Sequence, residues 1–433
     1  MNLSSSVAAS PQPPAGGGSS RAQLVTSLES RLFAELEQIQ VIDGHEHLPP
    51  ETDRVGRPVD VLTLFSHYTQ GDLRVAGMSE SALAEMQKPG LPLDYRWGLF
   101  APYWNQIRHG CYARAALIAV RKFYGEDDIN DETYLRISER MAAANKPGIY
   151  QRVLGDACNI RTALTQCERT DLGTPLLTPV MPLVPHLWEL DTWEGVQRQH
   201  GSSEAINTLD GFLAASRGYI VRVKSEGAVG LKMLSNPYES PSRASAQESF
   251  EDLRLGRVDH LPFRNPLRDY LVDEMIRFAG EQGMVVCVHT GYWGDFRTLD
   301  PLHMIPILER HPKVRFDMYH LGYPWVRESI MLGKGFANVW LNFCWTHVIS
   351  QRFAMDALDE VIEMVPMNKV IGFGGDYNLP VEKAYGHITM AREDIARVLA
   401  GRIERGLLTE DQALGLARKW LWENPKELYR LAV

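Results

Sequence analysis

Cysteine is scarce in this sequence, which has five among 433 residues, at positions 111, 158, 167, 287 and 344. Their number is odd and no two form a Cys-x-x-Cys pair, which excludes a disulfide-stabilised scaffold. Cys287 and Cys344 lie inside apolar runs and are expected to be buried like other small hydrophobic residues. This usage is typical of a reducing compartment, and we expect a cytoplasmic protein.

An excess of positive charge is also missing. The chain has 45 Lys and Arg against 54 Asp and Glu, a net charge of −9, with no clustered basic run. We therefore expect no nucleic-acid partner. No apolar run reaches the ~18 residues of a membrane span, so no membrane partner is expected either. The first residues lack the basic and apolar regions of a secretory signal, and the Ser, Pro and Gly content of residues 1–23 predicts a flexible tail.

What the sequence does contain is an ordinary globular balance, with 45% hydrophobic and 23% charged residues. Its apolar runs predict eight strands, most of them continuous, as in parallel strands buried on both faces. The predicted strands are 39–48, 159–167, 176–183, 228–234, 284–291, 314–322, 339–345 and 370–377.

The segments between the later strands have helix signals. Asn265-Pro266 and Asp300-Pro301 each place a capping residue before a proline, which is typical of a helix start. Alternating strands and helices in this number predict an α/β fold, specifically a (β/α)₈ TIM-type barrel. A doubly wound open sheet is the alternative, but no Gly-x-Gly-x-x-Gly follows the first strand to support it.

One gap is too long for a single helix. Residues 50–158 contain helical patterns and are expected to form a mostly helical insertion after strand one, at the catalytic end of the barrel. Residues 237–263 are polar and irregular and are expected to form a loop or lid. The predicted organisation is thus a tail, 1–23, followed by one metal-dependent barrel, 24–433, that includes the insertion.

Histidine and aspartate stand at the ends of four predicted strands. His45 and His47 close strand one as His-x-His, and residues i and i+2 of a strand point to the same side. His289 ends strand five, His320 ends strand six and Asp376 ends strand eight. The carboxyl ends of barrel strands converge on one mouth, where active sites lie.

These residue types suit a divalent metal, with zinc the first expectation and manganese or iron(II) as alternatives. His45, His47 and His289 are the candidate neutral ligands. Asp376 is the candidate fourth ligand and general base, because a carboxylate beside an activated water can move its proton. His320 is a candidate catalytic residue that would either hold a second metal or polarise a substrate carbonyl. Each residue alone also has a structural explanation, as a hydrogen-bonded core histidine or a turn.

Candidate substrate-binding residues lie beside these ligands. Lys232 ends strand four and could bind a substrate carboxylate, carry a metal-bridging carboxyl group, or pair with a neighbouring acid. Arg suits a planar carboxylate, and aromatic walls suit a ring or sugar face. The further candidates are Trp293, Arg297, Tyr323 and Trp345, with Tyr95, Arg96, Trp97, Trp104 and Arg108 from the insertion.

Several of these motifs resemble the amidohydrolase superfamily, and within it the amidohydrolase-related branch called amidohydrolase family 2. The matching pieces are IDGHEHL, VCVHTG, DMYHLG, GFGGDYN and the C-terminal ENPKELYRL. The resemblance covers 39–48 and 228–433 well, whereas 50–158 matches only loosely. A long insertion after the His-x-His is similar to that of the uronate isomerases of the same superfamily.

The resemblance implies a (β/α)₈ barrel and a divalent metal, most often zinc. It implies His45, His47 and His289 as ligands with Asp376 at the strand-eight position, and His320 as the histidine that is catalytic in single-metal members. Lys232 lies where two-metal members carry a bridging residue. The family's activities include hydrolysis, decarboxylation and sugar-acid isomerisation, so the fold does not fix the reaction.

We expect first a metal-dependent hydrolase of a C–N or C–O bond in a small, carboxylate-bearing substrate, using metal-activated water. A non-oxidative decarboxylase of an aromatic or unsaturated acid and a uronate-isomerase-like sugar-acid isomerase are the alternatives. A non-catalytic barrel is a further one, although a structural zinc site is usually closed by four protein ligands. A homo-oligomer is compatible with all of these, and the sequence specifies no oligomeric state.

Overall fold

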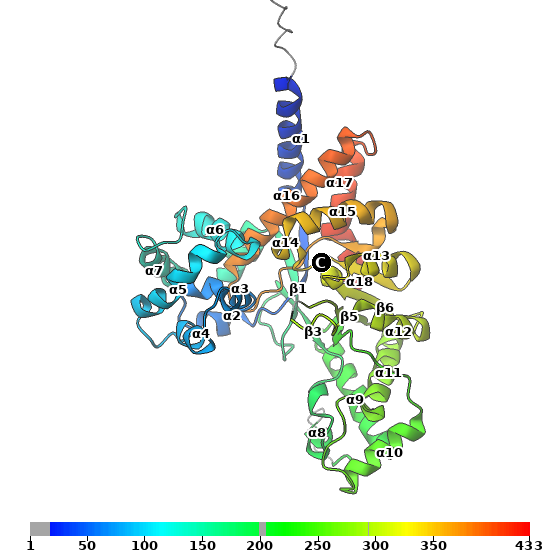
Figure 1. Ribbon diagram of the computed structural model, residues 1–433. Coiled ribbons are helices and arrows are strands. Elements are labelled where there is room, and N and C mark those ends of the chain that lie inside the picture. Colours follow the sequence, from blue (N-terminus) through cyan, green and yellow to red (C-terminus); the bar gives the residue numbers. More distant parts are fainter. Residues whose placement is uncertain (1–17, 199–204, 293) are drawn as a thin grey trace, which may run out of the picture.

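The computed structural model describes residues 18–198, 205–292 and 294–433, and its centre is a sheet of eight parallel strands in the order β1 to β8 (Figure 1). All eight predicted strands are present, and the predicted TIM-type barrel is confirmed. The strands are β1 Val41–Glu46, β2 Ile160–Gln166, β3 Leu177–Pro182, β4 Gly230–Leu234, β5 Val285–His289, β6 Arg315–Tyr319, β7 Val339–Asn342 and β8 Val370–Ile371.

The ring closes between β1 and the residues that follow the short β8. Gly44 N donates to Phe373 O at 3.0 Å, and Asp376 N donates to His45 O at 2.8 Å. His47 N continues the series by donating to Tyr377 O at 2.9 Å. These bonds hold Asp376 beside the two histidines of β1, so closure of the barrel itself builds part of the site.

Helices cover the outside of the barrel. Asn265 caps α11 by accepting a hydrogen bond from Arg268 N, with Pro266 at its first position, as predicted. The helices of this layer are α8 Trp193–Arg198, α9 Leu209–Ser225, α10 Arg243–Arg254, α11 Pro266–Glu281, α12 Ile305–Arg310, α13 Val326–Gly335, α14 Thr346–Ile349, α15 Gln351–Met364, α16 Glu382–Glu404, α17 Glu410–Arg418 and α18 Asn424–Tyr429.

One expectation for this layer is wrong. Residues 237–263 were expected to be an irregular loop, but they contain α10. Ser242 caps this helix by accepting a hydrogen bond from Ser245 N, and Phe250 and Leu253 are buried beneath it. The polar composition of the segment reflects its exposed face, while the few apolar residues at helical spacing cover the core.

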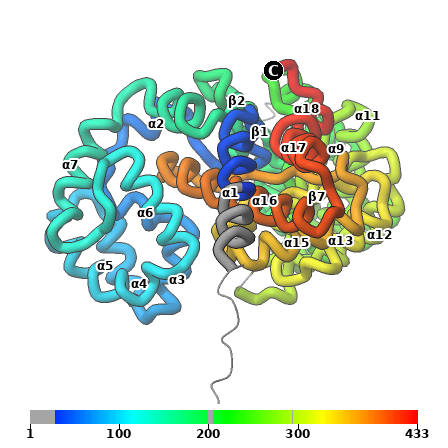
Figure 2. Tube along the Cα trace, turned by 90° about the horizontal axis from the view of Figure 1, so that it is seen from above, coloured from blue at the N-terminus to red at the C-terminus, as the bar shows by residue number. Residues whose placement is uncertain are grey.

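The insertion forms a lobe beside the barrel (Figures 1 and 2). It is mostly helical and has its own hydrophobic cluster, in which Phe65, Phe100 and Trp104 contact one another. Its helices are α2 Glu51–Val55, η1 Val61–Phe65, α3 Thr69–Val75, α4 Glu80–Met86, α5 Leu93–Ile107, α6 Cys111–Tyr124, α7 Tyr134–Ala144 and η2 Gln151–Ala157.

Polar groups and close backbone contact attach this lobe to the barrel. Arg54 of α2 forms a buried ion pair with Glu382 of α16 at 3.0 Å. Arg54 Nε also donates to Leu379 O at 2.9 Å, in the loop after β8. α6 lies so close to α16 that a Cβ added to Gly386 would be 2.0 Å from Ala115 O. The first residues of the insertion are therefore fixed against the loop that bears Asp376.

The N-terminal helix α1, Gly18–Gln38, precedes β1. It includes residues 18–23 of the segment expected to be a tail, and residues 1–17 lie outside the described residues. In the described part of the chain, no helix combines the length and apolarity needed to cross a lipid bilayer. All five cysteines are free thiols, in agreement with the sequence.

Candidate metal centre and substrate cavity

Three strand-end residues converge on one carboxylate. His45 Nε2 lies 3.3 Å from Asp376 Oδ1, and His47 Nε2 lies 3.4 Å from the same oxygen. His320, directly after β6, places its Nε2 3.9 Å from Asp376 Oδ2. Asp376 and His45 are fully buried, whereas the side chain of His47 is 30% exposed. His47 is thus the member of the group that faces the solvent-accessible side.

Backbone carbonyls orient two of these imidazole rings. His47 Nδ1 is 3.1 Å from Gln166 O, and His320 Nδ1 is 3.1 Å from Cys344 O. A carbonyl can only accept, so each Nδ1 carries the proton and each Nε2 presents a lone pair toward Asp376. Such an outer hydrogen bond is what usually fixes a metal-binding histidine.

The protonation states suit a cation. Burial lowers the pKa of His45 well below its usual value, and the charge of Lys232 lowers it further. Burial also lowers the pKa of His47 and of His320. Burial alone would raise the pKa of Asp376, but His45, with His320 and His47, holds it well below its usual range. Neutral imidazoles around an ionised carboxylate are the forms that metal binding requires.

The donor atoms also fit a metal by position. Ligand atoms of His45, His320 and Asp376 all lie within 4.8 Å of one another, and all three residues are buried. Imidazole nitrogen and carboxylate oxygen are donors that zinc, manganese and iron(II) accept. His45, His320 and Asp376, with His47 3.4 Å from Asp376 Oδ1, are therefore the residues that would hold a divalent ion.

A pair of buried acids supports the loop that bears Asp376. Asp43 accepts hydrogen bonds from His45 N at 3.2 Å and Gly375 N at 3.0 Å. Glu46 accepts from Tyr377 N at 2.5 Å. Burial raises the pKa of Asp43 to about 7 and that of Glu46 well above its usual value. A Cβ on Gly375 would lie 1.9 Å from Glu46 Oε1, so only glycine allows this close approach.

Two other predicted residues join the group indirectly. His289 Nδ1 lies 3.2 Å from His320 Nε2, so the structure pairs these two histidines. Of the two, His320 belongs to the cluster of ligand atoms described above. Lys232 Nζ lies 3.2 Å from His45 Nε2 and 4.0 Å from the centre of the Tyr319 ring.

The insertion contributes two side chains that the sequence did not single out. Burial and the nearby charge of Asp376 raise the pKa of the Tyr68 hydroxyl, and the Tyr68 ring lies 4.1 Å from that of Trp345. His67, the preceding residue, has its ring 6.2 Å from that of His47. No periodic pattern or motif in the sequence marks His67 or Tyr68, because the docking of the lobe alone brings them here.

Backbone strain gathers at the same place. His67, His320, Trp345 and Asp376 all have φ between 60° and 67°, in the left-handed region that residues with side chains rarely adopt. Each such residue costs about 1–3 kcal/mol and persists only where its surroundings enforce it. Three of them around the carboxylate of the fourth, Asp376, are typical of a functional site.

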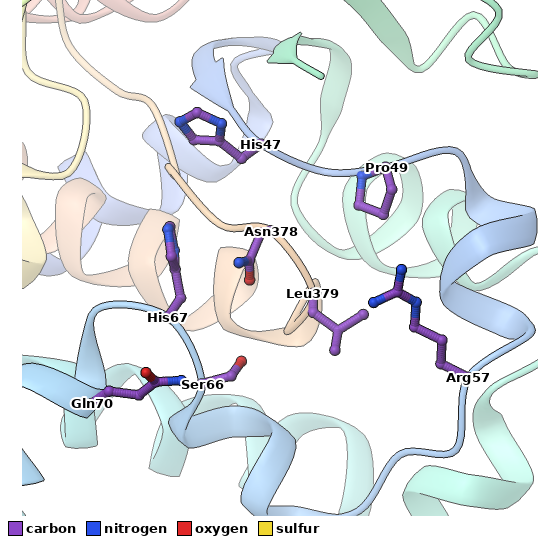
Figure 3. A pocket seen from close by; sticks show the side chains of 8 residues that line it. All are labelled: His47, Pro49, Arg57, Ser66, His67, Gln70, Asn378 and Leu379. Atoms are coloured by element: carbon purple, nitrogen blue, oxygen red, sulfur yellow. The ribbon is translucent and has the colours of Figure 1, made fainter. Parts of the chain in front are cut away.

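A cavity of about 500 Å³ opens beside His47 (Figure 3). This volume suits a small-molecule ligand. Its other residues come from the start of the insertion and the loop after β8: Pro49, Arg57, Ser66, His67, Gln70, Asn378 and Leu379.

The predicted substrate-binding residues are dispersed. Trp345 is buried, 5.5 Å from the His320 ring, and Lys232 lines a neighbouring cavity of about 300 Å³. The side chain of Arg297 is 85% exposed, pairs with Asp295 at 2.7 Å and lines a different cavity. The Tyr323 ring packs 4.7 Å from that of Phe353. Trp293 lies outside the described residues.

The aromatic and arginine residues of the insertion mostly support the lobe itself. Arg96 pairs with Asp60 at 2.6 Å, and Arg108 pairs with Asp128 at 2.7 Å. Trp97 and Trp104 are buried, with their indole nitrogens donating to Asp131 and Ile129 O. These side chains were expected at the mouth, but they form the core and outer polar contacts of the lobe.

Comparison with known proteins agrees with this architecture. A family model described as amidohydrolase matches residues 205–431, more than half of the chain. The chain belongs to the amidohydrolase family. The match covers β4 to β8 and so includes His289, His320 and Asp376.

Relatives extend the likeness over the whole chain. Uronate isomerase of Brucella suis is 23% identical, over 93% of this chain and 96% of that protein. The solved glucuronate isomerase of Caulobacter crescentus has a TM-score of 0.78 at 18% identity, over 96% of each chain. Protein fluG of Emericella nidulans is 26% identical over 175 residues, which are 38% of this chain and only 20% of that protein.

Proposed function

We propose that this amidohydrolase-family protein is a divalent-metal-dependent isomerase that interconverts the aldose and ketose forms of a sugar acid. The main observation in support of this proposal is that the similarity to uronate isomerases covers the insertion as well as the barrel. The insertion is the part that places His67 and Tyr68 at the candidate metal centre. A protein that shared only the barrel would lack this part of the site.

The reaction moves one hydrogen between two adjacent carbons and one proton between their oxygens. A bound ion would supply charge stabilisation for the oxygens as negative charge develops on them. Asp376 is ionised and buried, so it can accept a proton from a substrate hydroxyl. Burial, with Asp376, raises the pKa of Tyr68 well above its usual value, so its hydroxyl stays protonated and can donate to a substrate oxygen.

The positions of the neutral histidines fit this scheme. Burial keeps His320 uncharged, so its role would be to orient or polarise the carbonyl and not to supply a cationic acid. Burial likewise lowers the pKa of His67 to about 4, which leaves a neutral hydrogen-bonding group at the cavity wall. No net water is consumed, so the fully buried Asp376 need not activate a solvent molecule.

We rank this function above the hydrolase expected first from the sequence. The same metal centre could activate water for hydrolysis of a C–N or C–O bond, but the relatives that match by sequence over nearly the whole chain are named as uronate isomerases. Among the described residues, nothing specifically favours the decarboxylase. Zinc remains the first metal to test, with manganese and iron(II) as alternatives. The five free thiols support the expected reducing, cytoplasmic setting.

The test uses purified protein stripped with a chelator and reloaded separately with zinc, manganese or iron(II). Each form is incubated with hexuronates such as D-glucuronate, and the products are identified by nuclear magnetic resonance. We expect the ketose to form only with loaded protein, and not with His45→Ala/His47→Ala. A folded, metal-loaded protein that forms no ketose from any hexuronate, but hydrolyses an amide, ester or lactone, would favour the hydrolase.

A further inference from the structure

Lys383 is a buried residue that the proposed reaction does not use. It is the second residue of α16 and only 1% of it is exposed, although a lysine is almost never fully buried without a partner. Its Nζ donates a hydrogen bond at 3.0 Å to the hydroxyl of Thr69, the first residue of α3. Since α3 belongs to the lobe and α16 covers the barrel, this hydrogen bond crosses the junction between the two.

Aromatic rings from both sides of the junction surround the same nitrogen. Lys383 Nζ lies 5.6 Å from the centre of the Tyr112 ring, in α6 of the lobe, and 5.5 Å from that of the Tyr377 ring, which directly follows Asp376. These distances allow an attraction between the cation and the faces of the rings. Within the described part of the chain, the Thr69 hydroxyl is the hydrogen-bond acceptor of Lys383, and no carboxylate forms an ion pair with it.

The bonded threonine directly follows the two lobe residues that reach the candidate metal centre, His67 and Tyr68. Figure 3 shows the His67 side chain directed toward the side of the cavity that bears His47, and the two rings are 6.2 Å apart. His67 has a φ of 63°, a strained conformation that persists only where its surroundings enforce it. Because Thr69 lies two residues after His67, its hydrogen bond to Lys383 can hold this turn in place.

Other hydrogen bonds of the turn stay within the lobe. Ser66 Oγ donates to Thr63 O at 2.8 Å, and Gln70 N donates to His67 O at 3.1 Å. Bonds of this kind shape the turn but do not fix its distance from the barrel. The hydrogen bond from Lys383, together with the contact between the rings of Tyr68 and Trp345, connects the turn to the barrel.

We propose that Lys383 is a positioning residue, which holds the His67–Tyr68 turn at the candidate metal centre through its hydrogen bond to Thr69. This rests on the proposed function, in which His67 and Tyr68 face the substrate. Without the hydrogen bond, His67 can leave its strained conformation, and both side chains are then misplaced. A displacement of about 1 Å can lower the rate of an enzyme by about 10²-fold.

The test removes the hydrogen bond from either end in zinc-loaded protein. Lys383→Met and Thr69→Val each delete one partner and keep a similar shape, whereas Thr69→Ser keeps the hydroxyl. Lys122→Met is the matched control, because Lys122 is an exposed lysine of α6 that lies 5.1 Å from the Tyr385 ring of α16, across the same junction but away from the turn.

Turnover of D-glucuronate is the first readout. We expect kcat to fall at least about tenfold in Lys383→Met and in Thr69→Val, with zinc affinity unchanged. The double variant should be no slower than the slower single variant, because both changes remove the same hydrogen bond. Thr69→Ser and Lys122→Met should keep nearly the wild-type kcat. Losses that multiply in the double variant, or a Thr69→Ser protein as slow as Thr69→Val, would overturn the proposal.

Hydrogen exchange followed by mass spectrometry is the second readout, and it needs no turnover. In Lys383→Met and Thr69→Val, the amides of residues 66–75 should exchange at least about tenfold faster, with the exchange of α11 unchanged. Unchanged exchange of 66–75, or equally faster exchange in α11, would also overturn the proposal. If residues 66–75 respond as expected but the wild type forms no ketose, the positioning contact stands and the isomerase function fails.

Discussion

Lys232 Nζ lies 3.2 Å from His45 Nε2, the ring nitrogen that also faces Asp376. The same ammonium group lies over the Tyr319 ring, 4.0 Å from its centre. A cation therefore stands beside an atom that would bind a metal. Burial lowers the pKa of Lys232, while Asp376 acts in the opposite direction. The lysine acts as a positive neighbour of the metal-binding group and as a packing partner of Tyr319.

The first prediction concerns Lys232 and its effect on metal affinity. Lys232→Met should tighten metal binding at least about tenfold, because it removes a like charge while keeping the length of the side chain. Competition with a coloured chelator measures the affinity. Tyr319→Phe is the control, since it keeps the ring beneath Lys232 and leaves the charge in place. Loss of one of two bound metals in Lys232→Met would instead indicate a bridging lysine.

The second prediction concerns Asp376. Asp376→Asn should lower turnover by about 10²-fold or more, because the amide cannot accept the proton. The fold should persist, since Asn is one of the few residues that adopt the left-handed conformation found here, with φ of 60°. Metal should stay bound. The control is Asp317→Asn, a buried carboxyl bonded to Tyr429 at 2.6 Å and Asn342 at 3.0 Å. An active, metal-loaded Asp376→Asn protein would contradict the role.

The third prediction concerns the docking of the lobe. Gly386→Ala should destabilise the protein by about 1–3 kcal/mol, because the new methyl group would overlap the backbone of Ala115 and force α6 away from α16. Gly401→Ala is the matched control in the same helix, where nothing lies within 4 Å of an added Cβ. It should instead stabilise by about 0.5–1 kcal/mol. Chemical unfolding measures both, and equal effects would contradict close docking.

The fourth prediction is a pH dependence of stability. Lys383 is buried between barrel and lobe, donates to Thr69 Oγ1 at 3.0 Å, and burial lowers its pKa to about 7. The unfolded chain, with a lysine pKa of about 10.4, binds a proton between these values that the folded chain does not. The free energy of unfolding should therefore rise with pH over this range.

Replacing this lysine removes the effect. From pH 7 to 9, the wild type should gain about 1–3 kcal/mol relative to Lys383→Met. Urea unfolding at several pH values measures both proteins. Parallel profiles for the two would show that Lys383 keeps its proton in the folded state, with Asp72 as the charge that opposes the effect of burial.

The barrel could be predicted from the sequence because its strands are buried on both faces. Such strands occur in the sequence as continuous apolar runs, so the polar residues at their ends are easily recognised. His45, His47, His320 and Asp376 were found in this way. Their mutual distances follow from the convergence of strand ends and needed no knowledge of the loops.

The insertion could not be predicted in the same way. Its aromatic stretch was expected at the mouth, yet Trp97 and Trp104 fill the core of the lobe, since buried aromatics and binding aromatics have the same composition. His67 and Tyr68 were missed because their positions depend on tertiary contacts, chiefly the Arg54–Glu382 pair. Nothing local in the sequence encodes that docking.

We propose that the group around Asp376 interconverts an aldose and a ketose acid. The most direct measurement is the approach to equilibrium of metal-loaded protein with D-glucuronate, and separately with the corresponding ketose. We expect both reactions to reach the same mixture, with no other product, and Asp376→Asn to convert hardly any of either starting compound. A metal-loaded protein that converts neither compound into the other would contradict this function.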